Sequence, residues 1–144
     1  MGDVEIRELE SEAEWIDAYP LMNRLYPDVD EAQYLEYLAQ MTADGYRLFG
    51  LFSDGELAAL AGATILTNMY YGRHLWVYDL VTDPDHRSKG YGARFFRYLV
   101  EWAEKRGCET VALSSGLQRE RAHRFYEERT ELEKDAHVFT LDLS

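Results

Sequence analysis

Hydrophobic and polar residues alternate at the start of the chain, and the apolar positions then take the period of a helix. Residues 4–9 alternate between apolar and polar side chains over most of their length, which predicts a half-buried strand. Ser11 and Glu14 resemble a capping box, so we expect a helix that begins there and ends near Pro27.

A second helix is predicted from Asp30, a residue type that caps helices, to about Met41. Its apolar side chains recur every three or four residues and should form one buried stripe. The stripe consists of Tyr34, Leu35, Leu38 and Met41.

From Tyr46 onward the apolar positions follow the period of strands. Residues 46–52, a turn at 53–56 and residues 57–66 predict an antiparallel hairpin. Another turn at residues 70–73 leads into the later elements. These are predicted as a strand over 74–82, a helix over 90–106 closed by Gly107, a strand over 109–114, a helix over 117–129 and a strand over 136–143.

The order of predicted elements, βααβββαβαβ, is typical of an α+β or mixed-sheet α/β fold. The sequence contains no internal repeat, low-complexity tract or Pro/Gly/Ser-rich linker. We therefore expect residues 1–144 to form a single domain.

Composition and charge narrow the class of protein. The chain has 144 residues, of which 47% are hydrophobic, enough for a substantial core. A net charge of −12 disfavours binding to nucleic acid, which needs a basic face. No apolar run approaches the roughly 20 residues of a membrane span, and the N-terminus does not resemble a signal peptide. We expect a cytoplasmic protein that binds neither nucleic acid nor membranes.

The single cysteine, Cys108, cannot form an internal disulfide or a cysteine-rich metal site. It falls between a predicted helix and a predicted strand, where a small buried side chain is the usual explanation. The histidines are scattered without the spacing of metal ligands, so we expect no metal.

Residues 86–97, which read HRSKGYGARFFR, carry the strongest chemical signal. They follow a predicted strand, open a predicted helix and hold four Lys or Arg side chains without an acid. A helix N-terminus attracts negative charge, so basic residues there suggest an external anion such as a diphosphate. Gly90 and Gly92 would let backbone N–H groups approach its oxygens. The alternative is an ordinary glycine-containing loop with solvated arginines.

Two known phosphate-binding motifs do not fit this segment. The P-loop pattern is absent, and Phe95 stands where a dinucleotide fingerprint needs its third glycine. A dinucleotide-dependent enzyme is therefore the weakest interpretation.

Two segments resemble motifs of the GNAT superfamily of N-acetyltransferases. Arg87, Gly90 and Gly92 match the signature Arg/Gln-x-x-Gly-x-Gly/Ala at a strand-to-helix junction, and residues 79–86 before it are also typical. Residues 114–126, SSGLQRERAHRFY, are similar to the later motif on the next strand and helix. One departure follows, because the usual Gly-Phe after this motif is replaced near residues 129–131 by Arg-Thr-Glu.

This resemblance implies a central mixed, mostly antiparallel sheet, flanked by about four helices and splayed between the strands at 74–82 and 109–114. It implies acetyl-CoA as co-substrate, direct acetyl transfer without an acyl-enzyme, and a small-molecule or peptide amine as acceptor. A homodimer is left open. The residues that the resemblance assigns to acetyl-CoA are Leu80, Val81, Thr82, Arg87, Ser88, Lys89, Gly90, Tyr91, Gly92, Ala93, Ser115 and Arg119.

The resemblance also suggests two groups that handle protons. Tyr126 matches the superfamily tyrosine near the sulfur, where it would protonate the departing thiolate, although it could instead be a core aromatic beside Phe125. Asp79 is the best candidate base, since a carboxylate inside a strand is costly to bury without a partner, and its neighbour Tyr78 is a weaker candidate. A structural hydrogen bond is the alternative role for Asp79, and a backbone carbonyl with a water chain could replace it as base.

The amine acceptor should lie between the first two helices and the loop around residues 68–73. Asp28 or Asp30 could assist an aromatic wall there. The candidate tyrosines are Tyr26, Tyr34, Tyr37, Tyr70 and Tyr71. A different class of function, a non-catalytic module that senses CoA on the same scaffold, stays open.

Overall fold

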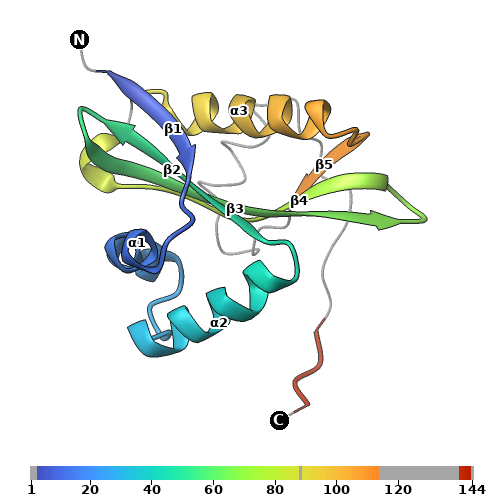
Figure 1. Cartoon of the computed structure of the whole chain (residues 1–144), viewed down its shortest axis with the longest axis horizontal. Coiled ribbons are helices and arrows are strands. Elements are labelled where there is room, and N and C mark those ends of the chain that lie inside the picture. The colour runs from blue at the N-terminus through green and yellow to red at the C-terminus, as the bar shows by residue number, and fades with distance from the viewer. Residues whose placement is uncertain (1–2, 88, 114–139, 144) are drawn as a thin grey trace. The chain divides into compact units, whose positions relative to one another are not determined.

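A five-stranded sheet with helices on both faces organises the described part of the chain (Figure 1). The computed structural model describes residues 3–87, 89–113 and 140–143. The elements are β1 (Val4–Glu8), α1 (Glu12–Leu25), α2 (Glu31–Ala43), β2 (Arg47–Ser53), β3 (Glu56–Asn68), β4 (Gly72–Thr82), a 3₁₀ turn (Pro84–His86), α3 (Tyr91–Lys105) and β5 (Thr110–Leu113). No helix among these is long and apolar enough to cross a membrane.

The strands lie in the order β1-β2-β3-β4-β5, and the first four pair as antiparallel neighbours. The amide of Glu109 donates to the carbonyl of Arg73 at 2.7 Å, so β5 begins beside the start of β4. This mostly antiparallel sheet with flanking helices confirms the fold class that the sequence predicts.

Local sequence signals produce the helix starts and the first hairpin. Ser11 accepts from the Glu14 amide while the Glu14 side chain returns to the Ser11 amide, which is a complete capping box. Asp30 caps α2 by accepting from the amide of Gln33 at 2.8 Å. At the β2–β3 turn, Asp54 and Gly55 both have positive φ, as a two-residue hairpin turn requires.

The sheet lies between two layers of helices (Figure 1). Helices α1 and α2 cover one face, where Leu21 and Leu38 pack with Leu60 of β3. Helix α3 covers the other face, where Trp102 meets Phe49 of β2 edge to face at 5.4 Å. The middle of β3, residues 58–64, is buried throughout because both of its faces are covered.

A β-bulge interrupts β4 at Tyr78. Gly62 of β3 faces Asp79, whereas the next residue, Ala63, faces Val77, so Tyr78 has no partner in the register. A bulge breaks the alternation of side chains along a strand. Tyr78 and Asp79 are therefore able to face the same side of the sheet, although they are consecutive residues.

Part of the predicted second half lies outside the described residues. The chain divides into two compact units, Met1–Ala112 and Leu113–Ser144. Most of the second unit, including the predicted helix over 117–129 and the departure at 129–131, is not described. Residues 140–143 have no regular secondary structure, so that half of the strand predicted over 136–143 is not formed. The single domain over residues 1–144 stays a prediction.

Candidate active site

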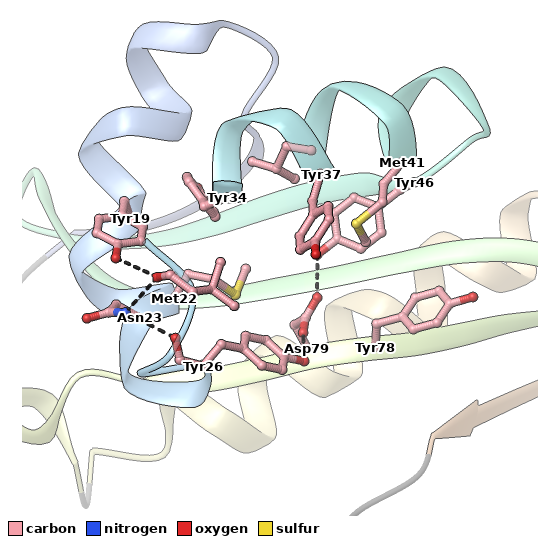
Figure 2. A pocket seen from close by; sticks show the side chains of 12 residues that line it. Tyr19, Met22, Asn23, Tyr26, Tyr34, Tyr37, Met41, Tyr46, Tyr78 and Asp79 are labelled. Atoms are coloured by element: carbon pink, nitrogen blue, oxygen red, sulfur yellow. Dashed lines mark hydrogen bonds between the residues drawn. The ribbon is translucent and has the colours of Figure 1, made fainter. Parts of the chain in front are cut away.

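A cavity of about 240 Å³ opens between α1, α2 and β4, entirely within the first unit (Figure 2). It lies on the face of the sheet that α1 and α2 cover. Aromatic and other apolar side chains dominate its lining. The lining residues are Tyr19, Met22, Asn23, Tyr26, Val29, Tyr34, Tyr37, Leu38, Met41, Tyr46, Tyr78 and Asp79.

Asp79 marks the inner end of this cavity, since only 5% of its surface is exposed. Its Oδ2 accepts a hydrogen bond of 2.5 Å from the Tyr46 hydroxyl, and its Oδ1 accepts one from the Tyr26 hydroxyl (Figure 2). Burial raises the pKa of Asp79 above its usual value, and the two hydrogen bonds act in the opposite direction. The carboxylate that the sequence marks as costly to bury thus has two tyrosine partners.

Gly62 makes the hydrogen bond from Tyr46 possible. A Cβ atom at Gly62 would lie 1.6 Å from the Tyr46 hydroxyl oxygen and 2.9 Å from Asp79 Oδ2. The missing side chain leaves the space in which Tyr46 crosses β3 to reach β4. Burial and the nearby Asp79 raise the pKa of Tyr46 well above its usual value, so Tyr46 stays a protonated donor.

Three tyrosines of the lining are exposed to solvent and mark where the cavity opens. Tyr26, Tyr37 and Tyr78 are 42%, 47% and 46% exposed. Deeper in the wall, the Tyr19 hydroxyl donates to the carbonyl of Val29 at 2.6 Å and the Tyr34 hydroxyl to that of Trp15 at 2.7 Å. These bonds hold both rings in place and leave ring surface toward the cavity.

The aromatic wall predicted from sequence is partly right. Tyr26, Tyr34 and Tyr37 line the cavity, whereas Tyr70 and Tyr71 lie in the turn between β3 and β4, outside its lining. Neither acid predicted to assist is a lining residue. The Asp30 side chain caps α2 instead. The acidic group in the wall is Asp79.

Sequence reasoning missed Tyr19 and Tyr46, and it named Tyr78 only as a lesser candidate base and not as a lining residue. Tyr19 carries a usable signal, because it stands three residues before Met22 and seven before Tyr26, on one face of a helix. Tyr46 and Tyr78 carry none. Their positions depend on Gly62 and on the bulge, which form only when β3 and β4 pair.

The first three residues that the resemblance assigns to acetyl-CoA directly follow Asp79. Leu80, Val81 and Thr82 are the last residues of β4 and are all partly exposed. Their register partners on β3 are Ala61, Leu60 and Ala59. The inner end of the cavity and this predicted cofactor segment are thus consecutive stretches of one strand.

The start of α3 has the features of an anion-binding helix end. Gly90 is its N-cap with φ +77°, no side chain caps it, and its first turn holds no acidic residue. The N–H groups of that turn have no intrahelical partner, and the exposed Arg87 and Lys89 before it add positive charge, so this helix end is positive and its own first turn supplies no acid. Tyr91 is fixed through a hydrogen bond of 2.8 Å between its hydroxyl and that of Ser53. Gly92 and Ala93 complete the turn.

Several predicted site residues lie outside the described part of the chain. They are Ser88, Ser115, Arg119 and Tyr126. Cys108 is described and is partly exposed rather than buried. Burial nevertheless raises the pKa of the Cys108 thiol, which keeps it in the poorly nucleophilic protonated form.

Known proteins resemble this chain in sequence. The sequence model of the acetyltransferase (GNAT) family matches residues 13–130. A protein of Bacillus subtilis (strain 168), described as "Uncharacterized N-acetyltransferase YhdJ", is 39% identical over 137 residues, which cover 94% of this chain and 96% of that protein.

Solved structures share the fold. The aminoglycoside N-acetyltransferase AAC(6')-Iy in complex with CoA superposes with a TM-score of 0.86 at 16% identity, covering 100% of this chain and 97% of that one. An acetyltransferase of Trypanosoma brucei gives a TM-score of 0.77 at 24% identity, covering 98% of this chain and 100% of that one.

Proposed function

The chain belongs to the acetyltransferase (GNAT) family, and we propose that it is an acetyl-CoA-dependent N-acetyltransferase that moves an acetyl group directly to a primary amine. The amine would occupy the cavity between α1, α2 and β4. Acetyl-CoA would lie along the end of β4 and the start of α3. A structural neighbour in complex with CoA, the aminoglycoside N-acetyltransferase AAC(6')-Iy, supports the choice of co-substrate.

One observation carries this proposal. Asp79, a buried carboxylate at the inner end of a tyrosine-lined cavity, is followed at once by the Leu80–Thr82 segment that leads to the start of α3. The chain thus brings an acidic group, an apolar cavity and an uncapped helix end together along one stretch of residues. Amine, thioester and diphosphate are the three chemical groups that these features suit.

In the proposed reaction the bound amine first loses its ammonium proton to water, and the neutral amine then attacks the thioester carbonyl carbon. The C–N bond forms, the C–S bond breaks, and the electron pair of that bond leaves with sulfur. The extra proton on nitrogen passes to Asp79, whose raised pKa makes it a better acceptor near neutral pH than an ordinary carboxylate. Tyr126 would donate a proton to the departing thiolate, and the backbone N–H near Val81 would polarise the acyl oxygen.

The first test is binding, measured by the thermal shift of the full chain with acetyl-CoA, CoA and NAD in parallel. At a hundred times its dissociation constant, a ligand should stabilise the folded state by about 2.7 kcal/mol. Both CoA forms should raise the melting temperature, and NAD should not. The absence of any shift with either CoA form in a folded sample would contradict the proposal.

The second test is turnover, measured as release of the CoA thiol with a panel of amines. Release should rise with a suitable amine and should fall at least ten-fold in Tyr126→Phe, while CoA affinity is unchanged. Full turnover in Tyr126→Phe would reject this residue as the proton donor. Binding of CoA without turnover of any amine would identify a CoA sensor instead of an enzyme.

A further inference from the structure

We propose that the acceptor is a small monoamine with an apolar body, preferred over polyamines and aminoglycosides. This inference deepens the proposed function and rests on it. It rests on the charge, chemistry and size of the cavity. Each of these properties suits a monoamine better than a polyamine or an aminoglycoside.

The cavity offers one acidic group to a cation. Among the lining residues in the described part of the chain, Asp79 is the single charged side chain. An ammonium group at Asp79 would lie at the inner end, among tyrosine rings that can also attract a cation through their faces. The positive charge of one ammonium group is therefore paired with the carboxylate of Asp79. A second ammonium on the same molecule would find no second carboxylate among the described lining residues, and beside Met22 or Leu38 the loss of its hydration is uncompensated.

The walls also suit an apolar body better than a sugar. The hydroxyl protons of Tyr19 and Tyr34 are engaged by backbone carbonyls, and those of Tyr26 and Tyr46 by Asp79. The side-chain amide of Asn23 donates to the carbonyls of Tyr26 and Val29. Few donors of the lining remain for the many hydroxyl groups of an aminoglycoside. Apolar surface, in contrast, is stabilised by burial against the rings.

Size favours the same class. A volume of about 240 Å³ lies below the common range of ligand pockets, which begins near 300 Å³. The net charge of −12 would attract any cation at long range, so it does not distinguish monoamines from polyamines. The cavity distinguishes the two classes, because each ammonium group that enters it needs a carboxylate partner.

The experiment compares three kinds of compound on the full chain. The probes are the monoamines phenethylamine and hexylamine, the neutral 2-phenylethanol, and the polycations spermidine and neamine. Binding is measured by calorimetry with and without CoA, and turnover by release of the CoA thiol. Phenethylamine should bind at least ten-fold more tightly than 2-phenylethanol. At least one monoamine should exceed both polycations ten-fold in kcat/KM.

Two results would overturn the inference while leaving the proposed function intact. One is a higher kcat/KM for spermidine or neamine than for both monoamines. The other is equal affinity for 2-phenylethanol and phenethylamine, which would show that the cavity does not recognise the positive charge of the amine. If neither CoA form binds, the proposed function fails, and calorimetry with the amines alone still decides whether the cavity selects a monoamine.

A variant with a second acidic group gives an independent test. Met41 lines the cavity and is partly exposed, so a polar side chain of similar length can be placed there without filling the core. Met41→Glu should raise the kcat/KM of spermidine relative to phenethylamine at least ten-fold. Met41→Gln, similar in size but neutral, should leave that ratio within about two-fold. An unchanged ratio in a folded Met41→Glu variant would count against selection by charge pairing.

Discussion

Tyr46 and Asp79 are joined by a hydrogen bond of 2.5 Å that crosses the sheet above Gly62. Tyr46 immediately precedes β2 and Asp79 belongs to β4, so the bond spans the intervening strand β3. It fixes the carboxylate at the inner end of the cavity and satisfies one of its buried oxygens. The integrity of the proposed acceptor site therefore depends on a glycine that is not one of the residues lining the cavity.

Gly62→Ala should disrupt the acceptor site. The new Cβ would overlap the Tyr46 hydroxyl, so Tyr46 must move and Asp79 loses a donor. We expect a loss of about 1–3 kcal/mol in the free energy of unfolding and at least a ten-fold loss of amine affinity. Urea denaturation and calorimetry measure the two effects.

Gly50→Ala is the matched control for this substitution. A Cβ at Gly50, in β2, would meet the ends of Leu57 and Phe52 at 2.9 and 3.0 Å, away from Asp79. This variant should lose stability without losing amine affinity. Equal losses of affinity in both variants would show that Gly62 acts through general stability and not through Tyr46.

Asp79→Asn should change how stability depends on pH. Because burial raises the pKa of Asp79 above its ordinary 3.8, the folded state holds this proton over a window in which the unfolded state has released it. Stability contributed by this group is therefore present below about pH 3.8 and lost as pH rises through the folded pKa.

An asparagine at position 79 does not titrate, so the variant does not lose stability as the pH rises through the folded pKa of Asp79. Urea denaturation at stepped pH should show the stability of Asp79→Asn, relative to the natural chain, increasing from about pH 4 upward and then levelling off. A difference that stays flat or decreases with pH would mean that the pKa of Asp79 is not raised in the folded state.

Glu14→Gln should have the opposite pH dependence. The hydrogen bond from Arg7 and the amides of Ser11 and Glu10 lower the pKa of Glu14 from 4.5 to about 2, against a smaller effect of burial. Its contribution to stability is present above pH 4.5 and is lost as pH falls toward 2. Since the pair is partly exposed, we expect a loss of at most about 1 kcal/mol at pH 7, shrinking below pH 4.

The control for Glu14 is Glu12→Gln, which removes the same charge from the first turn of α1 without touching the capping box. Its effect on stability should be smaller than that of Glu14→Gln at pH 7. Equal effects would attribute the contribution of Glu14 to the helix dipole alone.

Gly92→Glu should abolish CoA binding and leave the fold intact. Gly92 is the second residue of α3, and an acid in the first turn of a helix normally stabilises it. There it would compete with the diphosphate of the proposed co-substrate. Calorimetry with CoA should detect no binding at an unchanged or slightly higher melting temperature. Gly92→Ala, which keeps the small residue of the motif, should bind CoA within a few-fold of the natural chain.

The sequence by itself determined the local elements of this protein. The capping pair Ser11 and Glu14, the Asp30 cap and the turn at Asp54-Gly55 each involve groups within four residues of one another, so their chemistry can be read directly along the chain. The motif around Gly90 also leads to the family, because it too is a local pattern at one strand-to-helix junction.

The tertiary structure alone decided how the cavity is built. Asp79 was recognisable as a buried carboxylate, but its partners Tyr46 and Tyr26 are 33 and 53 residues away in sequence. A regular strand would turn the consecutive residues Tyr78 and Asp79 to opposite faces, and only the bulge against β3 lets both line the cavity. Strand pairing sets that bulge through hydrogen bonds between distant segments, which no period in the sequence encodes.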